Sequence, residues 1–360
     1  MNPLQLLPWL DGRRAPASWP ARGALGLLGG IGTLYGALQW TRPFFIRPGR
    51  APCPVISVGN LTTGGTGKTP MVLWLARLLQ QRGRRVAIVS RGYRQRSREP
   101  VTVVADPDGQ RLHPPMAADE ACLLARALPG VTLLTGKHRP LLIRHAVERF
   151  QCDLVLMDDG FQRLDVDKDL DLVLLDARRP FGNGRLLPGG LLREFPSALR
   201  RCDAIVLTRA DDPTATDDTL RYLQKNFPDK PVMTATHRPT AWIPLHEPVT
   251  PLPLDALTGP LLPFCALAAP DGFLQTLRTL DIPLCPLRPF PDHHFFTPAE
   301  IRQLLDEARR HGAEALVCTE KDAVKLHPHQ IPFPLHALRV EMTFTVQPIW
   351  LKERILCANI

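Results

Sequence analysis

Residues 54–70 read PVISVGNLTTGGTGKTP, and this segment predicts a strand, a glycine-rich loop and the start of a helix, in that order. The apolar residues from Met71 to Leu79 that follow the loop recur with helical spacing. Backbone N–H groups of such a loop converge on phosphate oxygens, and the helix N-terminus adds partial positive charge. We expect Lys68 to reach the outer phosphates of a nucleoside triphosphate, and the Thr69 hydroxyl to bind Mg²⁺.

The loop departs from the strict phosphate-binding pattern at one position. That pattern has glycine five residues before Gly67, where this chain has Thr62. The alternative is a glycine-rich turn that contains Gly-Lys-Thr by chance, and the register of strand, loop and helix argues against it. The predicted nucleotide-binding residues are therefore Thr62, Thr63, Gly64, Gly65, Thr66, Gly67, Lys68 and Thr69.

A second apolar segment, residues 154–157, ends in Asp158 and Asp159. Apolar residues followed by carboxylates are typical of a Walker B strand, which brings acidic groups to the carboxyl edge of the sheet beside the phosphate loop. Alone, such a strand end would as often be a simple turn. The loop upstream favours a Mg²⁺ site made by Thr69, Asp158 and Asp159, with the directly coordinating carboxylate left open.

Strand-like and helix-like segments alternate along the first two thirds of the chain. This alternation predicts an α/β fold with a doubly wound, mainly parallel sheet of the P-loop NTPase type, followed by a second, smaller α/β lobe. The expected division is a membrane-associated N-terminal segment, a P-loop core, a Pro-rich linker or excursion and the second α/β lobe, at residues 1–50, 51–225, 226–262 and 263–360.

Residues 23–41 contain no charged side chain and are flanked by arginines on both sides. A spanning helix needs about 20 apolar residues, and the glycines in this segment weaken helix formation. A cleaved signal peptide would fit in form, but the nucleotide site that follows needs a compartment that contains nucleotide. We favour a membrane-associated helix, with Trp40 at the headgroup level, over a helix buried in the core. Whether it spans the membrane or lies on it is left open.

The charge balance favours an anionic partner. The chain has 360 residues and a net charge of +9, and four arginines lie in one long loop at 178–194. A loop of that length inside a compact domain is usually functional. No Lys/Arg run resembles a nucleic-acid-binding arm, so we expect no nucleic-acid partner. The eight cysteines are scattered singly, which fits reduced thiols in a cytosol.

Seven short segments stand out along the chain, namely VGNLTTGGTGKTP at 58–70, SRGY at 90–93, DE at 119–120, DDGFQ at 158–162, FGNGRLLP at 181–188, PDHH at 291–294 and TEKDAVK at 319–325. Together they resemble the tetraacyldisaccharide 4′-kinase (lipid A 4′-kinase) family. They run in the family's order, and the apolar N-terminal segment lies where the family has its membrane helix. The missing first glycine of the phosphate loop is also a family trait.

The resemblance implies transfer of the γ-phosphoryl group of ATP, with Mg²⁺, to the 4′-hydroxyl of a tetraacyl disaccharide 1-phosphate lipid in lipid A biosynthesis. It also implies a location at the cytoplasmic face of the inner membrane of a Gram-negative cell, and we expect a monomer. The family's catalytic base corresponds to Asp119, assisted by His293, with Lys68 at the donor. A positioned carboxylate suits this role, because the sugar hydroxyl must lose a proton. The residues that we assign to the lipid substrate are Arg91, Glu120, Gln162, Arg185, Arg193 and Glu194.

Two positions depart from the family pattern. The family usually has His after DDGFQ, and this chain has Arg163. The family's Gly-Ile-Gly-Asn-Pro in the second lobe is replaced by Ala-Ala-Pro-Asp-Gly at 268–272, so contacts between the lobes can differ there.

Two other classes of protein are open from the residues alone. A regulatory or assembly NTPase of the deviant Walker class needs a signature lysine, where this chain has Thr63. A GTPase-type binding module is suggested by Thr-Arg-Ala-Asp at 208–211, which resembles the guanine-reading Asn/Thr-Lys-x-Asp with arginine in place of lysine. Competition between ATP and GTP, and dependence on a lipid acceptor, distinguish these classes from a lipid kinase.

Overall fold

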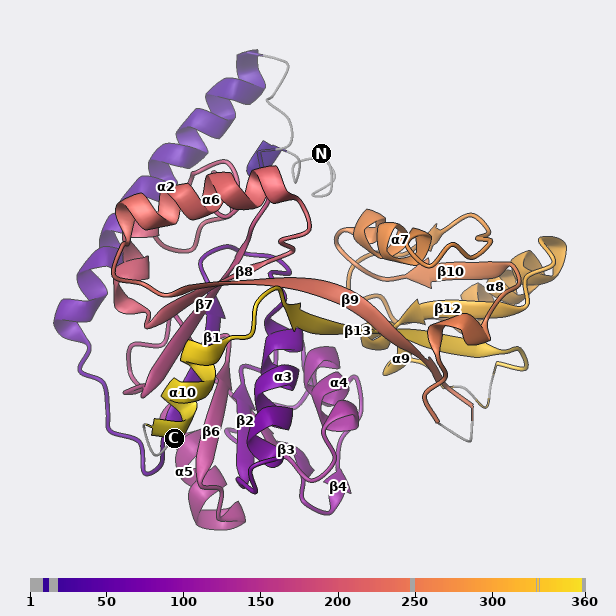
Figure 1. The fold of residues 1–360 in the computed structure, drawn as a ribbon, viewed down its shortest axis with the longest axis horizontal. Helices are drawn as coiled ribbons and strands as arrows, with labels where there is room; N and C mark the ends of the chain where they lie inside the picture. Colours follow the sequence, from indigo (N-terminus) through magenta and orange to yellow (C-terminus); the bar gives the residue numbers. More distant parts are fainter. Residues whose placement is uncertain (1–8, 13–18, 247–249, 328, 330, 358–360) are drawn as a thin grey trace.

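The computed structural model describes residues 9–12, 19–246, 250–327, 329 and 331–357. Residues 1–8 and 13–18 of the expected N-terminal segment therefore lie outside the described part. The strands form one sheet in the order β11-β10-β12-β13-β9-β8-β7-β1-β6-β2-β5-β3-β4 (Figure 1).

The bounds of the elements are as follows. The strands are β1 (Val55–Asn60), β2 (Val86–Ser90), β3 (Thr102–Asp106), β4 (Gly109–Gln110), β5 (Thr132–Thr135), β6 (Leu154–Asp158), β7 (Leu170–Asp176), β8 (Ala204–Thr208), β9 (Val232–Pro244), β10 (Leu261–Cys265), β11 (Arg288–Pro289), β12 (Ala315–Thr319) and β13 (Leu335–Phe344). The helices are α2 (Trp19–Phe45), α3 (Lys68–Gln80), α4 (Asp119–Ala127), α5 (Arg139–Phe150), α6 (Pro213–Asn226), α7 (Pro270–Arg278), α8 (Pro298–Arg310), α9 (Glu320–Ala323) and α10 (Ile349–Cys357).

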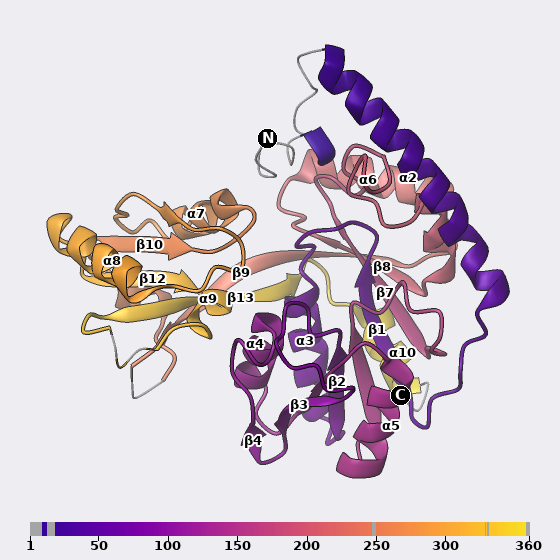
Figure 2. The same ribbon diagram turned by 180° about the vertical axis from the view of Figure 1, so that it is seen from behind.

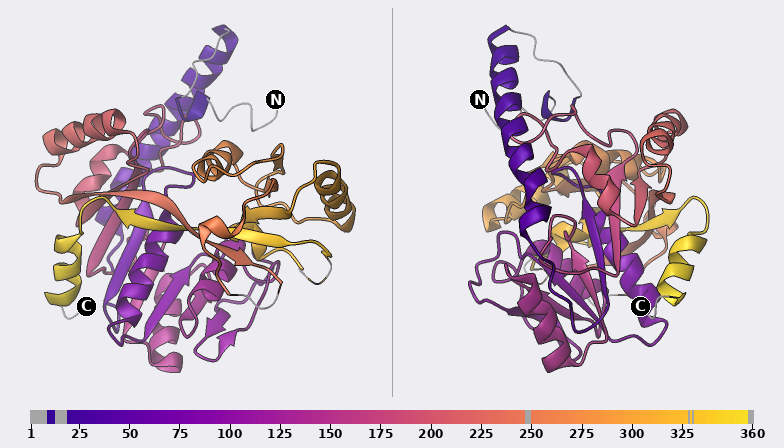
Figure 3. Two further views of the ribbon diagram at one scale, coloured as in Figure 1. Left: turned by 45° about the vertical axis from the view of Figure 1, so that its right-hand side comes forward. Right: turned by 90° about the vertical axis from the view of Figure 1, so that its left-hand side faces the viewer.

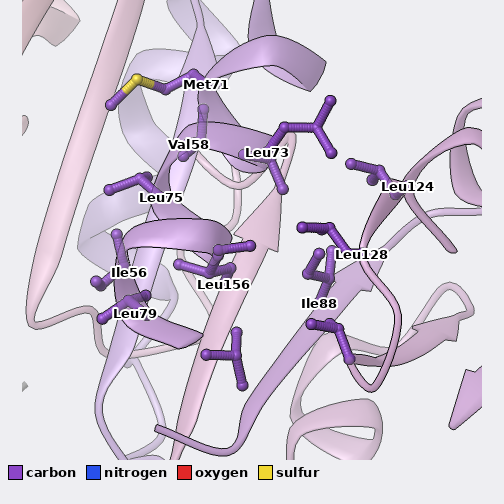
Figure 4. Packing of buried hydrophobic residues seen from close by; sticks show 14 of the residues in the cluster. Ile56, Val58, Met71, Leu73, Leu75, Leu79, Ile88, Leu124, Leu128 and Leu156 are labelled. Carbon is purple, nitrogen blue, oxygen red and sulfur yellow. The ribbon is translucent and has the colours of Figure 1, made fainter. Parts of the chain in front are cut away.

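The core is a parallel sheet covered by helices on both faces. Strands β8, β7, β1, β6, β2 and β5 pair in parallel, and β3 joins β5 antiparallel. Because side chains alternate between the faces of a strand, Ile56 and Val58 pack with α3 and α4, whereas Val55 packs with α5. Figure 4 shows the first of these clusters. The predicted doubly wound, mainly parallel α/β fold is confirmed.

Residues 226–262 differ from the expected irregular linker. They contain β9, whose first residues pair in parallel with β8 and whose remainder pairs antiparallel with β13. Both strands run from the core into the second lobe (Figure 2). The proline content was misleading because Pro239 pairs with Val340 beside a register shift, where a missing N–H does little harm.

The second lobe extends the same sheet. Strand β12 pairs in parallel with β10 and β13, and helix α8 packs Leu304 and Ala308 into the lobe's own apolar cluster. The chain then returns, because Leu351 and Ile355 of α10 join the core cluster around α3. Helix α10 therefore packs on the core, although residues 263–360 were expected to belong to the second lobe.

Helix α2 runs along one side of the core and extends beyond it (Figure 3). Three of its glycines form the contact face: a Cβ on Gly29 would lie 3.1 Å from Nη1 of Arg185, one on Gly32 would lie 2.6 Å from the carbonyl oxygen of Leu186, and one on Gly36 would lie 2.7 Å from the ring of Phe195. Large apolar side chains on α2 are exposed instead, namely Leu27, Ile31, Leu34, Tyr35, Leu38, Trp40, Phe44 and Phe45. Among the described helices, α2 included, none has the length and apolar character needed to cross a bilayer.

Candidate active site

The phosphate loop joins β1 to α3 at the carboxyl edge of the parallel strands. Gly64 and Gly67 have φ values of 124° and 84°, which favour glycine. Side chains hold the loop in place: the Nδ2 of Asn60 donates to the Oγ1 of Thr66 at 3.0 Å, and the Oγ1 of Thr208 donates to the Thr66 carbonyl at 2.9 Å. The loop is therefore shaped by its own contacts, in the predicted order of strand, loop and helix.

Two cations converge on the carboxylate of Asp159. The Nζ of Lys68 lies 3.4 Å from one oxygen, and Nη1 of Arg193 lies 2.8 Å from both oxygens. Gln162 accepts from Arg193 at 3.2 Å and donates to the carbonyl of Asn60 at 2.9 Å. Burial alone would raise the pKa of Asp159, but the charges of Lys68 and Arg193 outweigh it and lower this pKa. Arg193 and Gln162 thus tie Asp159 to the phosphate loop.

Asp158, the last residue of β6, has the opposite electrostatic environment. Its side chain is buried, and burial followed by the charge of Glu120 raises its pKa to about 7. Its Oδ1 has no hydrogen-bond partner in the described part of the chain. A buried, unpartnered carboxylate oxygen is unfavourable unless a ligand or ion satisfies it.

The donors at this edge fit Mg²⁺. Thr69 offers a hydroxyl on the first turn of α3, and Asp158 and Asp159 offer carboxylates at the end of β6. Magnesium bound with a nucleotide takes one or two protein carboxylates and completes its shell with water and phosphate oxygens. The unpartnered oxygen of Asp158 is the feature of the described residues that fits such an ion best. Magnesium at this place would neutralise charge on the phosphates.

Asp119 and His293 come from different lobes and lie side by side. Asp119 is the first residue of α4, and His293 lies in the loop before α8 with φ at 63°. The Nδ1 of His293 is 3.1 Å from the Oδ2 of Asp119, and the two side chains are only 14% and 7% exposed. The backbone N–H of His293 donates to the carbonyl of Ala266 at 3.4 Å. The structure thus brings together two predicted catalytic residues that are 174 positions apart.

Two of the predicted substrate residues bond to other parts of the protein. Arg185 donates from Nη1 to the Leu25 carbonyl of α2 at 2.7 Å. Glu194 is buried and accepts from Arg201 at 2.8 Å, while its other carboxylate oxygen has no partner among the described residues. Arg185 therefore lies at the N-terminal helix and not with the carboxylates of β6.

Of the six predicted substrate residues, Gln162 and Arg193 lie at Asp159, and the remaining two, Arg91 and Glu120, are more accessible. Arg91 is exposed in the loop after β2. Glu120 is half exposed, and its carboxylate lies 4.0 Å from the Nζ of Lys321. Both remain available to a ligand.

Sequence reasoning missed three residues near these groups. Lys321 lies 3.4 Å from the Nε2 of His293 and was visible only as part of a longer motif. Arg139 is buried at the start of α5, and burial lowers its pKa to about 10. His237 on β9 packs against the phosphate loop, because a Cβ added to Gly67 would lie 2.6 Å from its ring. Burial lowers the pKa of His237 to about 4. No local pattern signalled His237, because it lies in the segment that was expected to be a linker.

A glycine-rich phosphate loop beside two carboxylates, with a buried Asp–His pair supplied by two lobes, defines a P-loop phosphotransferase. Comparisons with known proteins identify its family. The family profile described as Tetraacyldisaccharide-1-P 4'-kinase matches residues 25–358. The chain belongs to this tetraacyldisaccharide 4′-kinase family.

Individual relatives agree with the family match. The Tetraacyldisaccharide 4'-kinase of Anaeromyxobacter dehalogenans (strain 2CP-C) is 46% identical over 283 residues, covering 78% of this chain and 74% of the relative. That of Syntrophotalea carbinolica is 41% identical over 322 residues, covering 87% of each. The crystal structure of "apo" form LpxK from Aquifex aeolicus in complex with ATP superposes with a TM-score of 0.76 at 29% identity, covering 94% of this chain and 100% of that one.

Family membership confirms the predicted activity class. The protein is a kinase that uses ATP with Mg²⁺, and the family's reaction is 4′-phosphorylation of a tetraacyl disaccharide 1-phosphate in lipid A biosynthesis. It also decides against the regulatory NTPase and the GTPase-type module.

Proposed function

We propose that this chain transfers the γ-phosphoryl group of ATP to the 4′-hydroxyl of a tetraacyl disaccharide 1-phosphate, with Asp119 as the general base. The observation that supports this most is the 3.1 Å contact between His293 and a buried Asp119. Glu120, the next residue, is close enough to raise the pKa of Asp158. The proposed base therefore lies near the carboxylates that would hold Mg²⁺.

The proposed reaction assigns one task to each group. Asp119 takes the proton of the 4′-hydroxyl while the hydroxyl oxygen bonds to the γ-phosphorus of ATP. The bond from that phosphorus to the β–γ bridging oxygen breaks, and ADP leaves. The N–H of His293 at Nδ1 orients the Asp119 carboxylate. Lys68 and the loop N–H groups position the phosphates and offset their charge. Arg193 and Gln162 keep Asp159 at the edge of the loop.

We further propose that the protein is a monomer and that α2 anchors it to the cytoplasmic surface of the inner membrane. Four of its side chains, Leu27, Leu34, Leu38 and Phe45, are each about 70–80% exposed. They are seven, four and seven residues apart, so they form one apolar stripe on the face opposite Gly29, Gly32 and Gly36. An exposed apolar stripe on a helix is suited to insertion at the headgroup boundary.

The protein would then bind its lipid substrate at the membrane surface on which α2 lies. Arg185 donates to the Leu25 carbonyl and lies 3.1 Å from where a Cβ on Gly29 would be, so its guanidinium lies against the side of α2 that faces the core. A guanidinium there suits the 1-phosphate or an anionic headgroup. Arg91 and Glu120, which are accessible, remain proposed contacts of the substrate, whereas Glu194 is buried and paired with Arg201.

The catalytic proposal is tested with purified protein, ATP, Mg²⁺ and the disaccharide 1-phosphate in mixed detergent micelles. Lys68→Ala and Asp119→Ala should each abolish phosphate transfer to the lipid. The matched controls are Lys225→Ala and Asp217→Ala, both exposed on α6, which should keep full activity. Full activity in either site variant would overturn the mechanism.

The membrane proposal has its own test. Leu34→Asp with Leu38→Asp should reduce co-flotation with vesicles that contain anionic lipid, while turnover of substrate in micelles is retained. Wild-type flotation in this variant would refute the assignment of the stripe. Sedimentation of the active protein in detergent should give the mass of one chain.

A further inference from the structure

We propose that Lys321 is a positioning residue that holds His293 neutral, with its ring proton on Nδ1. This inference rests on the proposed function, in which His293 orients the base. The Nζ of Lys321 lies 3.4 Å from Nε2 of His293 and 3.4 Å from the carboxylate of Asp292. It therefore occupies the side of the imidazole ring opposite Asp119.

The two contacts of the ring select the same tautomer. A lysine ammonium has three donors and no acceptor, so the Nε2 that faces it must offer a lone pair. In a neutral imidazole the proton is then on Nδ1, and Nδ1 is the atom 3.1 Å from the Asp119 carboxylate. Lys321 thus directs the N–H of His293 at the proposed base.

Asp292 would have the opposite effect if Lys321 were absent. Its Oδ2 lies 3.7 Å from Nε2 of His293, so its charge favours a proton on that nitrogen. A doubly protonated His293 would make Asp119 a weaker base, because a nearby positive charge stabilises the carboxylate. The titratable and charged groups in contact with the ring are Tyr93 after β2, Asp119 on α4, Asp292 in its own loop and Lys321 on α9. Beyond them, Arg94 contacts the backbone of Asp292, and Glu120 contacts Lys321.

The backbone of Ala266, the residue after β10, holds the segments of both Lys321 and His293. The N–H of Ala266 donates to the carboxylate of Asp322, the neighbour of Lys321, at 3.1 Å. The carbonyl of the same Ala266 accepts from the N–H of His293 at 3.4 Å. Asp322 is also fully buried against Lys325 at 2.7 Å, so α9 is firmly placed. The Lys321–His293 contact is therefore built into the end of β10.

The test is the pH dependence of kcat in the lipid kinase assay. Lys321→Met should move the acid limb to higher pH by about one unit, which is about tenfold lower kcat on the acid side. Lys321→Arg should stay close to wild type. The double variant Lys321→Met/Asp292→Asn should move the limb back, because the charge that favours protonated His293 is gone. A limb that does not move in Lys321→Met, or does not return in the double variant, overturns the proposal.

Controls separate this inference from the proposed function. If Asp119→Asn and His293→Gln keep full kcat, the base assignment fails and the role of Lys321 fails with it. If those variants are inactive while Lys321→Met keeps the wild-type profile, only the role of Lys321 is wrong. Lys321→Gln, which retains an uncharged donor, replaces the methionine variant if that one does not fold, and the same displacement is expected. Lys225→Met on α6 controls for loss of a surface lysine.

Discussion

Replacing Gly67 with alanine tests how the phosphate loop is held. Gly67 is the residue before α3 and has φ at 84° and ψ at 23°. A Cβ added there would lie 2.6 Å from both Cε1 and Nε2 of His237, and 3.5 Å from a methyl group of Thr208. The substitution therefore combines backbone strain with a collision against a side chain of β9.

The two costs can be separated. A non-glycine residue in the left-handed region costs roughly 1–2 kcal/mol. The contact with His237 is about 1 Å inside the optimal separation, and turning the ring off its rotamer costs about 0.5–1.5 kcal/mol. Gly67→Ala should thus lower the free energy of unfolding by about 2–3 kcal/mol. In a His237→Ala background only the backbone strain of about 1–2 kcal/mol should remain.

The assay is a double-mutant cycle in urea, with wild type, Gly67→Ala, His237→Ala and the double variant. The expected coupling between the two sites is about 0.5–1.5 kcal/mol. The KM for ATP should rise in Gly67→Ala, because the loop N–H groups must shift with the helix start, and should partly recover in the double variant. Equal costs of Gly67→Ala in both backgrounds would show that His237 does not confine the loop.

Three further predictions concern stability and packing. Burial lowers the pKa of His237 from 6.5 to about 4, so as the pH falls the unfolded chain binds this proton before the folded one does. The free energy of unfolding should therefore be highest above pH 6.5 and fall by about 3 kcal/mol toward pH 4. His237→Asn should flatten that part of the curve of unfolding free energy against pH. Lys325→Met leaves the buried Asp322 carboxylate unpaired and should cost about 3–5 kcal/mol in urea denaturation, with partial recovery in Lys325→Met/Asp322→Asn. Gly32→Leu should displace α2 from the loop at residues 178–194 and speed proteolysis of α2. Gly30→Leu should not, because a Cβ on Gly30 has no neighbour within 4 Å.

Much of the fold follows from local patterns in the sequence. Strand, loop and helix around Gly67 can be predicted because each signal is contained within a few residues. The same holds for the strand that ends at Asp158, since a fully apolar run followed by acid is typical of a parallel strand. Their proximity also follows, because parallel strands present their carboxyl ends at one edge of a sheet.

Other features depend on contacts between distant residues and had no local signal. The role of β9 was hidden by Pro239, which lies beside a register shift of the sheet. The proximity of Asp119 and His293 came from the family resemblance, since an acidic helix start and a loop histidine are individually commonplace. The glycines of α2 were counted against a helix, but Gly32 and Gly36 are what lets this helix approach the arginine-rich loop.

The long strands connect the two halves of the proposed site. His237 on β9 lies against the phosphate loop at Gly67, and Glu341 on β13 bonds to Arg77 of α3 at 2.5 Å. Strand β13 also pairs with β12, whose last residue leads into α9 and Lys321. The donor loop and the groups around His293 are therefore fixed by the same pair of strands. Because Asp119 lies on α4 of the core, a change in the register of these strands would displace His293 relative to Asp119 and the phosphate loop.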